Sequence, residues 1–270
     1  MKYKLLVVDL DGTLVNARGS ISERDRKAIT AARTQGIIVA LSTGRVIEAC
    51  RNFIIDLGLD GVHIFFDGAL TYDLSVREKV SVQPISFENL HSAVAYARAN
   101  STYLELYAID RYFVEEITWA EKVHREFFGL TATLADFDDI IRQEEIIKCE
   151  LMVRNAEEDR KARLFLEHFA GKLFGSVART PAYPEMRFIN VVDPCVSKGA
   201  SLEKLASHLG LSLSQIMAIG DGTNDLPLLE KAGLKIAMGN AREELKDIAD
   251  HVTSSVDESG VAAAVNRYLL

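Results

Sequence analysis

The chain is poor in cysteine, proline and tryptophan, with 3 Cys, 5 Pro and 1 Trp in 270 residues. Cys50, Cys149 and Cys195 are odd in number and widely spaced, and none has a neighbouring Cys or His at metal-ligand spacing. This pattern argues against a disulfide framework and against a thiolate metal site. We therefore expect three packing residues with free thiols, as in a protein of the reducing cytoplasm.

Long apolar runs and excess positive charge are also lacking. No run approaches the roughly 20 apolar residues of a membrane helix, and Asp9 and Asp11 interrupt the first apolar run, so we expect no signal peptide. The net charge of −8 and the isoelectric point near 5.4 argue against nucleic-acid binding, which normally requires a basic face. The sequence therefore predicts no membrane or nucleic-acid partner, and no obligate protein partner is evident.

The most informative stretch present is the run Leu5–Thr13. Four apolar residues, Leu5–Val8, are typical of a buried parallel strand. Asp9 and Asp11 follow it, two positions apart, so their side chains should point into the same small space. Gly12 permits a sharp turn. Acidic side chains at this point lie where open α/β sheets place their ligands, although an ordinary acidic turn is the bland alternative.

A second strand is predicted to bring hydroxyl groups to the same edge. Ser22 is a suitable N-cap for a helix at residues 23–35, and the apolar run 37–41 then ends in Ser42 and Thr43. A strand, helix and strand of this length form a βαβ unit with a right-handed, parallel connection. The hydroxyls should therefore emerge beside Asp9.

The middle of the chain differs in character from both ends. Its strands are shorter and alternate in polarity, which is typical of antiparallel sheets with one exposed face. We predict an α/β fold: a doubly wound parallel-sheet core formed by residues 1–80 and 188–270, with an α+β cap domain inserted at residues 81–187. The expected cap strands are 103–107, 112–114 and 149–153, and the expected cap helices are 87–99, 120–128 and 157–169.

Buried strands return near Phe188 and bring more polar groups. Ser197 is a suitable N-cap, and Lys198 falls in the first turn of its helix, where the helix dipole disfavours a cation. Lys198 is therefore either an ordinary surface lysine or the partner of an anion. A strand at residues 216–219 then ends in three further polar residues: Asp221, Asn224 and Asp225.

These charges can gather only with a cation. Two carboxylates about 5 Å apart repel each other by roughly 3 kcal/mol at an effective dielectric near 20. Because the cluster contains oxygen donors and no His or Cys, Mg²⁺ is the natural ion. Mg²⁺ and Lys198 would attract a phosphate group, with Thr43 and Asn224 as donors. A carboxylate held against the phosphorus can then act as a nucleophile.

Four segments carry a resemblance to a known family. Asp9–Thr13, Ser42–Arg45, Ser197–Gly199 and Gly220–Asp225 resemble the four motifs of the haloacid dehalogenase-like hydrolases. Motif order, spacing and the insertion between the second and third motifs resemble the Cof-type branch, subfamily IIB. Any one motif is weak, but four in order make a chance match very improbable.

The resemblance implies a role for each matched position. Asp9 would be the nucleophile and a Mg²⁺ ligand. Asp11 would bind the metal through its backbone carbonyl, protonate the leaving alcohol and later deprotonate the attacking water. Asp221 would bind Mg²⁺, supported by Asp225 directly or through water. The positions that would hold the phosphate are Leu10, Thr43, Gly44, Lys198 and Asn224. The inserted domain would cover the site and determine the substrate.

One position departs from the family pattern: Asp67 stands where Asn usually precedes Gly-Ala. It either alters leaving-group preference or faces solvent. Arg45 follows the second motif and is at least as easily a structural ion-pair partner. Three cap residues are candidates for substrate contact, but nothing distinguishes them from ordinary loop residues: Tyr183, Glu185 and Arg187.

The leading hypothesis is a cytoplasmic Mg²⁺-dependent phosphatase of a small phosphorylated metabolite, with sugar phosphates as the expected class. A phosphomutase of the same superfamily is the alternative enzyme, and a phosphate-ester sensor without turnover is the alternative outside catalysis. Dehalogenation is disfavoured because halide departure needs no general acid such as Asp11. A signalling receiver domain is about half this length and has no cap.

Overall fold

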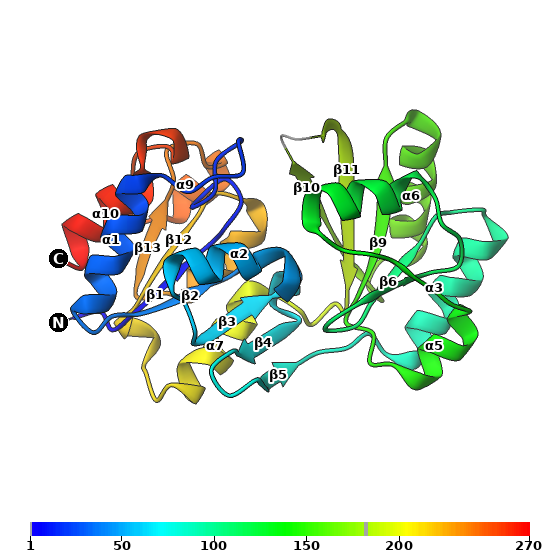
Figure 1. The fold of residues 1–270 in the computed structure, drawn as a ribbon, viewed down its shortest axis with the longest axis horizontal. Coiled ribbons are helices and arrows are strands. Elements are labelled where there is room, and N and C mark those ends of the chain that lie inside the picture. The colour runs from blue at the N-terminus through cyan, green and yellow to red at the C-terminus, as the bar shows by residue number, and fades with distance from the viewer. Residues whose placement is uncertain (1, 181–182) are drawn as a thin grey trace. The chain divides into compact units, whose positions relative to one another are not determined.

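The computed structural model describes residues 2–180 and 183–270, with the side chains of 127, 128, 178–180 and 184 left aside. The chain forms two compact units (Figure 1). The first comprises Met1–Thr43, Asn52–Ser81 and Ser197–Leu270, and the second comprises Gly44–Arg51 and Val82–Val196. The first unit is therefore assembled from both ends of the chain.

The first unit contains a parallel sheet of five strands in the order β14-β13-β12-β1-β2. The strands are β1 (Leu5–Val8), β2 (Ile38–Leu41), β12 (Ile216–Gly220), β13 (Leu234–Ala237) and β14 (His251–Val252). From β1 the chain proceeds to β2 on one side, and it later returns to β12 on the other side. The boundary between β1 and β12 is thus the switch point at which such sheets bind ligands.

The helices of this unit are α1 (Glu23–Thr34), α7 (Lys198–His208), α8 (Leu226–Lys231), α9 (Glu243–Ile248) and α10 (Gly260–Tyr268), and α2 (Ile47–Leu57) spans both units. Two of them, α1 and α7, begin at caps that the sequence predicts. Ser22 accepts a hydrogen bond from the Asp25 amide at 3.0 Å, and Ser197 accepts one from the Ala200 amide at 3.1 Å. Asp25 is itself buried and accepts a 2.7 Å bond from the Ala262 amide, which joins α1 to α10.

A small sheet of three strands follows β2 in the chain. Its strands are β3 (Val62–Phe65), β4 (Leu70–Asp73) and β5 (Glu78–Val82). Ser42, which directly follows β2, forms a parallel bridge with Ile64 of β3. The chain reverses direction between β3 and β4 because Phe66, Asp67 and Gly68 all have positive φ angles, of 52°, 56° and 105°.

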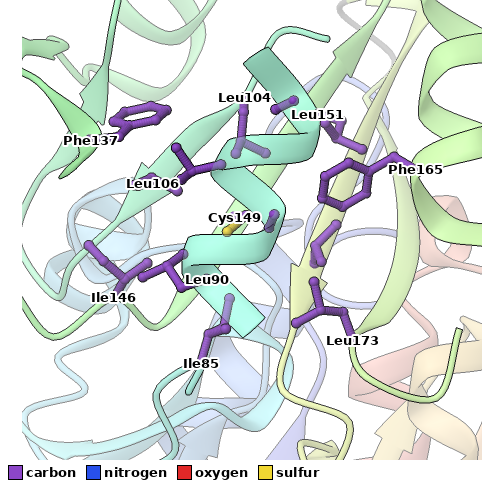
Figure 2. Close-up of a cluster of buried hydrophobic side chains, with 14 of the residues drawn as sticks. Ile85, Leu90, Leu104, Leu106, Phe137, Ile146, Cys149, Leu151, Phe165 and Leu173 are labelled. Atoms are coloured by element: carbon purple, nitrogen blue, oxygen red, sulfur yellow. The ribbon is translucent and has the colours of Figure 1, made fainter. Parts of the chain in front are cut away.

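The second unit contains a sheet of six strands in the order β10-β11-β9-β6-β7-β8. The strands are β6 (Glu105–Tyr107), β7 (Tyr112–Val114), β8 (Thr133–Leu134), β9 (Lys148–Val153), β10 (Phe174–Thr180) and β11 (Tyr183–Val192). The helices α3 (Phe87–Ala99), α5 (Phe137–Gln143) and α6 (Ala156–His168) pack with one face of the sheet. Figure 2 shows the resulting core, in which Leu106, Cys149 and Phe165 lie among other buried side chains.

Three details of this unit differ from the expectation, and the first is that residues 44–51, which we placed in the core, group with it. Residues 188–196 group with the second unit, although we placed the return of the core at Phe188. The reason is that β11 pairs with both β9 and β10, so Ile189 and Val191 are buried in this sheet. The predicted helix at 120–128 is instead α4 (Trp119–Val123) followed by a π-helical turn, His124–Phe128.

Among the residues described, no helix has the length and apolar character needed to cross a membrane.

Candidate active site

The predicted carboxylates of Asp9, Asp221 and Asp225 and the ammonium of Lys198 come together in the first unit. Asp9 and Asp11 follow β1, Thr43 follows β2, Asp221 follows β12 and Lys198 opens α7. Parallel strands end at one edge of their sheet, and β1 and β12 are adjacent, so Asp9 and Asp221 lie at the switch point. Segments separated by most of the chain therefore share one site.

Lys198 is almost completely enclosed within this site. Its Nζ donates a 2.6 Å hydrogen bond to Oδ1 of Asp9 and another of 2.6 Å to Oδ1 of Asp225. The side chain is 1% exposed, so neither interaction is shared with bulk water. This arrangement rules out the alternative of an ordinary surface lysine.

Asp225 organises the loop after β12. Its Oδ1 accepts from Lys198, and its Oδ2 accepts from the backbone amides of Asp221 and Gly222 at 3.0 Å each. The 3-10 turn Thr223–Asp225 brings this carboxylate back against the start of its own loop. Both oxygens of Asp225 are therefore already engaged within the protein.

Asp221 is held by side chains from two other loops. Thr13 donates a 2.9 Å hydrogen bond to its Oδ1, and the Asn240 amide lies 3.5 Å from its Oδ2 while donating to the Gly12 carbonyl at 2.8 Å. Gly12 has a φ of +90°, and a Cβ there would stand 2.4 Å from Oδ2 of Asp221. Glycine thus adopts this turn without strain and leaves the Asp221 carboxylate in place.

The turn after β3 joins the site from another direction. The Asp67 amide donates to the Thr43 carbonyl at 3.0 Å, and the Asn224 side chain donates through Nδ2 to Oδ1 of Asp67 at 2.9 Å. Asp67 is buried, so the suggestion that it faces solvent is wrong.

The remaining predicted residues occupy less central places. The Leu10 side chain is fully buried, Asp11 is exposed, and Gly44 directly follows the buried Thr43. Arg45 donates to the Ala49 carbonyl at 3.3 Å. The cap candidates are in β11: Tyr183 packs beside Met152 and Phe188, Glu185 is exposed, and Arg187 pairs with Asp159 of α6.

Burial and crowding perturb the acid–base behaviour of the site. Burial and the neighbouring Asp225 carboxylate raise the pKa of Asp9 well above its usual value, although Lys198 opposes the shift. Burial and Asp225 likewise raise the pKa of Asp221 to about 6. Burial lowers the pKa of Lys198, but Asp225 and Asp9 raise it more, so Lys198 stays protonated. The carboxylates of the site outnumber its cations, and this excess of negative charge favours the binding of a further cation.

The donor set suits Mg²⁺. Asp9, Asp221 and Asp225 each offer a carboxylate oxygen, and these oxygens all lie within 4.8 Å of one another. Hard oxygen ligands without nitrogen or sulfur are what Mg²⁺ prefers. Because hydrogen bonds engage both oxygens of Asp225, Asp9 and Asp221 are better placed as direct ligands.

Sequence reasoning missed two features. Asn240 was not among the predicted site residues. Its position shortly after β13, at the same edge of the sheet, could have indicated it. The second is a buried group in the other unit, where Glu105, His124 and Glu150 offer atoms within 4.8 Å of one another. Alternation along β6 and β9 places both glutamates on one sheet face, and that was the available signal.

The fold and site define a class of enzyme. A family model described as haloacid dehalogenase-like hydrolase matches residues 6–265, so the chain belongs to that family, as the four motifs predicted. Several of its relatives are named phosphatases or putative phosphatases, and the protein is a phosphatase-type enzyme of this family.

Particular relatives cover the whole chain. The chain is 28% identical over 267 residues to the 5-amino-6-(5-phospho-D-ribitylamino)uracil phosphatase YcsE of Bacillus subtilis, covering 99% of this chain and 96% of the relative. It is 30% identical over 279 residues to a putative phosphatase of Streptococcus pyogenes, covering 100% of both. A haloacid dehalogenase-like hydrolase from Bacteroides thetaiotaomicron has a TM-score of 0.84 at 28% identity, covering 98% of this chain and 99% of that one. The fold also matches a subclass IIB sugar phosphatase, with a TM-score of 0.80 at 23% identity, covering 99% of this chain and 100% of that one.

Proposed function

We propose that the protein is a Mg²⁺-dependent phosphatase that hydrolyses a small phosphorylated metabolite through an aspartyl-phosphate on Asp9. Sugar phosphates are the expected substrate class, and the cytoplasm is the expected location. The observation that carries the proposal is the fully buried Lys198 ammonium, which bridges Asp9 and Asp225 at 2.6 Å each. A cation in that position holds the nucleophile, and because an ammonium has three donors, one N–H remains for a phosphate oxygen.

The proposed reaction has two displacements at phosphorus. An oxygen of Asp9 attacks the phosphorus, the bond to the substrate alcohol breaks, and Asp11 gives its proton to the departing oxygen. Water then attacks the phosphoryl group of the aspartyl-phosphate, and Asp11 takes a proton from that water. The bond between phosphorus and the Asp9 oxygen breaks, which regenerates the Asp9 carboxylate and frees inorganic phosphate. The exposure of Asp11 suits a residue that must meet both an alcohol and water.

Asp9 and Asp221 would hold Mg²⁺, together with the backbone carbonyl of Asp11, and Asp225 would support them through its hydrogen bonds. When bound, Mg²⁺ supplies positive charge that offsets the crowded carboxylates and the phosphate. The Lys198 ammonium, the Thr43 hydroxyl, the Asn224 amide and the backbone at Leu10 and Gly44 would orient the phosphate oxygens.

The proposal is tested by phosphate release from a panel of phosphorylated metabolites, with Mg²⁺ and with a chelator. We expect release without any bisphosphate activator, abolished by the chelator. Asp9→Asn should lower the rate by about 10³-fold or more, while thermal unfolding shows that the variant is still folded. Asp56→Asn, which removes an exposed carboxylate paired with Arg26, is the matched control and should leave the rate unchanged.

Other results would favour the alternatives. Isomerisation of a sugar phosphate that requires a bisphosphate would indicate a mutase. Tight binding of a phosphate ester without turnover would indicate a sensor. Unchanged phosphate release by Asp9→Asn would refute the assignment of the nucleophile.

A further inference from the structure

Asp67 contacts three of the segments that build the site. Its side chain accepts the 2.9 Å hydrogen bond from Nδ2 of Asn224, and its amide donates to the Thr43 carbonyl at 3.0 Å. Its carboxylate also contributes to the raised pKa of Lys198. Asp67 thus lies where the segments that carry Thr43, Lys198 and Asn224 meet, and it is well placed to set their mutual orientation.

The backbone at this turn is held in an uncommon conformation. Phe66 and Asp67 are consecutive non-glycine residues with φ angles of 52° and 56°. Asp tolerates this left-handed region better than most residues, whereas a bulky Phe does so rarely. Such a conformation is energetically unfavourable and persists only where its surroundings enforce it.

The surroundings of Gly68 provide that enforcement. A Cβ at Gly68 would stand 2.4 Å from the Ser197 carbonyl oxygen and 2.9 Å from the Lys198 amide nitrogen. The Ser201 hydroxyl also donates to the Gly68 carbonyl. The turn is therefore pressed against the beginning of α7, and it fixes the position from which Asp67 reaches Asn224.

We propose that Asp67 is a positioning residue that dictates which end of the Asn224 side-chain amide faces the phosphate. This inference rests on the proposed function. A carboxylate only accepts hydrogen bonds, so Asn224 must turn its nitrogen toward Asp67. One N–H of that nitrogen bonds Asp67, and the other N–H remains for a phosphate oxygen.

The chemistry of position 67 explains why Asp and Asn differ there. An Asn side chain offers both a donor and an acceptor, so it can pair with either end of the Asn224 amide. Asp67 permits only one orientation, and the rejected one would present the Asn224 oxygen to an anion. The departure from the usual Asn thus specifies the orientation of a neighbouring phosphate-binding residue.

The test is a double-mutant cycle between positions 67 and 224. Asp67→Gly removes the side chain and tolerates the positive φ, whereas Ala would be strained there. We expect Asp67→Gly to raise the KM of the substrate about tenfold, the size expected for one hydrogen bond to a charged group. The dissociation constant of inorganic phosphate should rise by the same factor, with a smaller change in kcat.

The positioning role predicts that the two substitutions are not additive. In an Asn224→Ala background, Asp67→Gly should have no further effect on phosphate affinity, because the group it orients is gone. Asp67→Asn keeps an acceptor and should lose only a few-fold. Additive losses in the double variant, or unchanged phosphate affinity in Asp67→Gly, would overturn the inference.

Two controls separate the possible failures. Thermal unfolding shows whether Asp67→Gly is folded, and if it is not, the cycle is run with Asp67→Asn and Asp67→Ser. Phosphate binding is measured calorimetrically, independently of turnover. Absence of turnover in the unmodified protein would then count against the proposed function, whereas phosphate affinity insensitive to position 67 would count against the positioning role.

Discussion

The Nζ atom of Lys198 lies 2.6 Å from Oδ1 of Asp9, although 189 positions of sequence separate the two residues. Both side chains are almost completely buried, and Lys198 also bonds Asp225. Burial of a charged lysine side chain is unfavourable unless carboxylates pair with it. The contact therefore links the first strand of the core to the segment that follows the inserted unit.

Replacement of Lys198 by Met should destabilise the protein strongly. The substitution leaves two buried carboxylates without their cation, and breaking such a pair costs about 3–5 kcal/mol. Urea unfolding at pH 7 in the presence of a chelator measures the loss. Lys231→Met is the control, because Lys231 pairs with Glu203 on the surface at 2.7 Å, where water screens the pair, and its loss should cost far less than the loss of Lys198. Equal losses in the two variants would contradict the account.

Thr13→Val should weaken the affinity for Mg²⁺. The Thr13 hydroxyl is buried and donates to Asp221 at 2.9 Å, and loss of a residue that orients a metal ligand costs roughly 10–100-fold in metal affinity. The Mg²⁺ concentration for half-maximal phosphate release should rise at least about tenfold. Thr30→Val, which removes an exposed hydroxyl bonded to the Arg26 carbonyl, should leave that concentration unchanged. An unchanged requirement in Thr13→Val would show that Asp221 needs no support from it.

The sequence could predict which strand ends meet, because parallel strands share one edge and side chains alternate with a period of two. Asp9, Thr43 and Asp221 were placed in this way. The buried state of Lys198 could not be derived from its helix position alone, since a surface lysine has the same local pattern. Its burial depends on Asp9 and Asp225, which lie on either side of its ammonium and come from distant parts of the sequence.

The parts that sequence could not predict depend on backbone conformation and long-range pairing. Asp225 accepts two backbone amides because a 3-10 turn folds it back, and no residue pattern specifies that turn. Asp67 reaches Asn224 from a left-handed conformation that its residue type permits but does not demand. Phe188 was assigned to the core because buried strands look alike, whichever sheet they join.

His63 should make the protein less stable in acid. Burial lowers the pKa of His63 to about 4, and its Nδ1 accepts the Leu41 amide at 3.0 Å, which requires the neutral ring. The unfolded chain binds a proton near pH 6.5, so this stabilisation is present above pH 6.5 and is lost as the pH falls toward 4. The loss amounts to about 3 kcal/mol by the linkage of pKa to stability.

The contribution of His63 is isolated by comparison with His63→Asn, which keeps an acceptor for the Leu41 amide but does not titrate. Urea unfolding from pH 8 to pH 4 should show a steeper decline in the unmodified protein than in the variant. Parallel curves would mean that His63 gains its proton as readily in the folded protein as in the unfolded chain.

His124 should have the opposite dependence on pH. Its Nε2 lies 2.9 Å from Oε2 of Glu105 and 3.6 Å from Oε1 of Glu150, both buried. Burial lowers the pKa of His124, but these carboxylates raise it more, against a small opposing effect of Lys148. Protonated His124 and Lys148 carry two positive charges, which balance the negative charges of the two glutamates.

The sign follows from the raised pKa. Stabilisation by protonated His124 is fully present below pH 6.5 and is lost as the pH rises through the higher pKa of the folded state. The difference in unfolding free energy between the unmodified protein and His124→Gln should therefore be largest near pH 6 and should shrink toward pH 9. His208→Gln, at an exposed histidine 3.9 Å from Asp73, should show little difference at any pH. A His124→Gln difference that grew with pH would mean that the ring is neutral between its carboxylates.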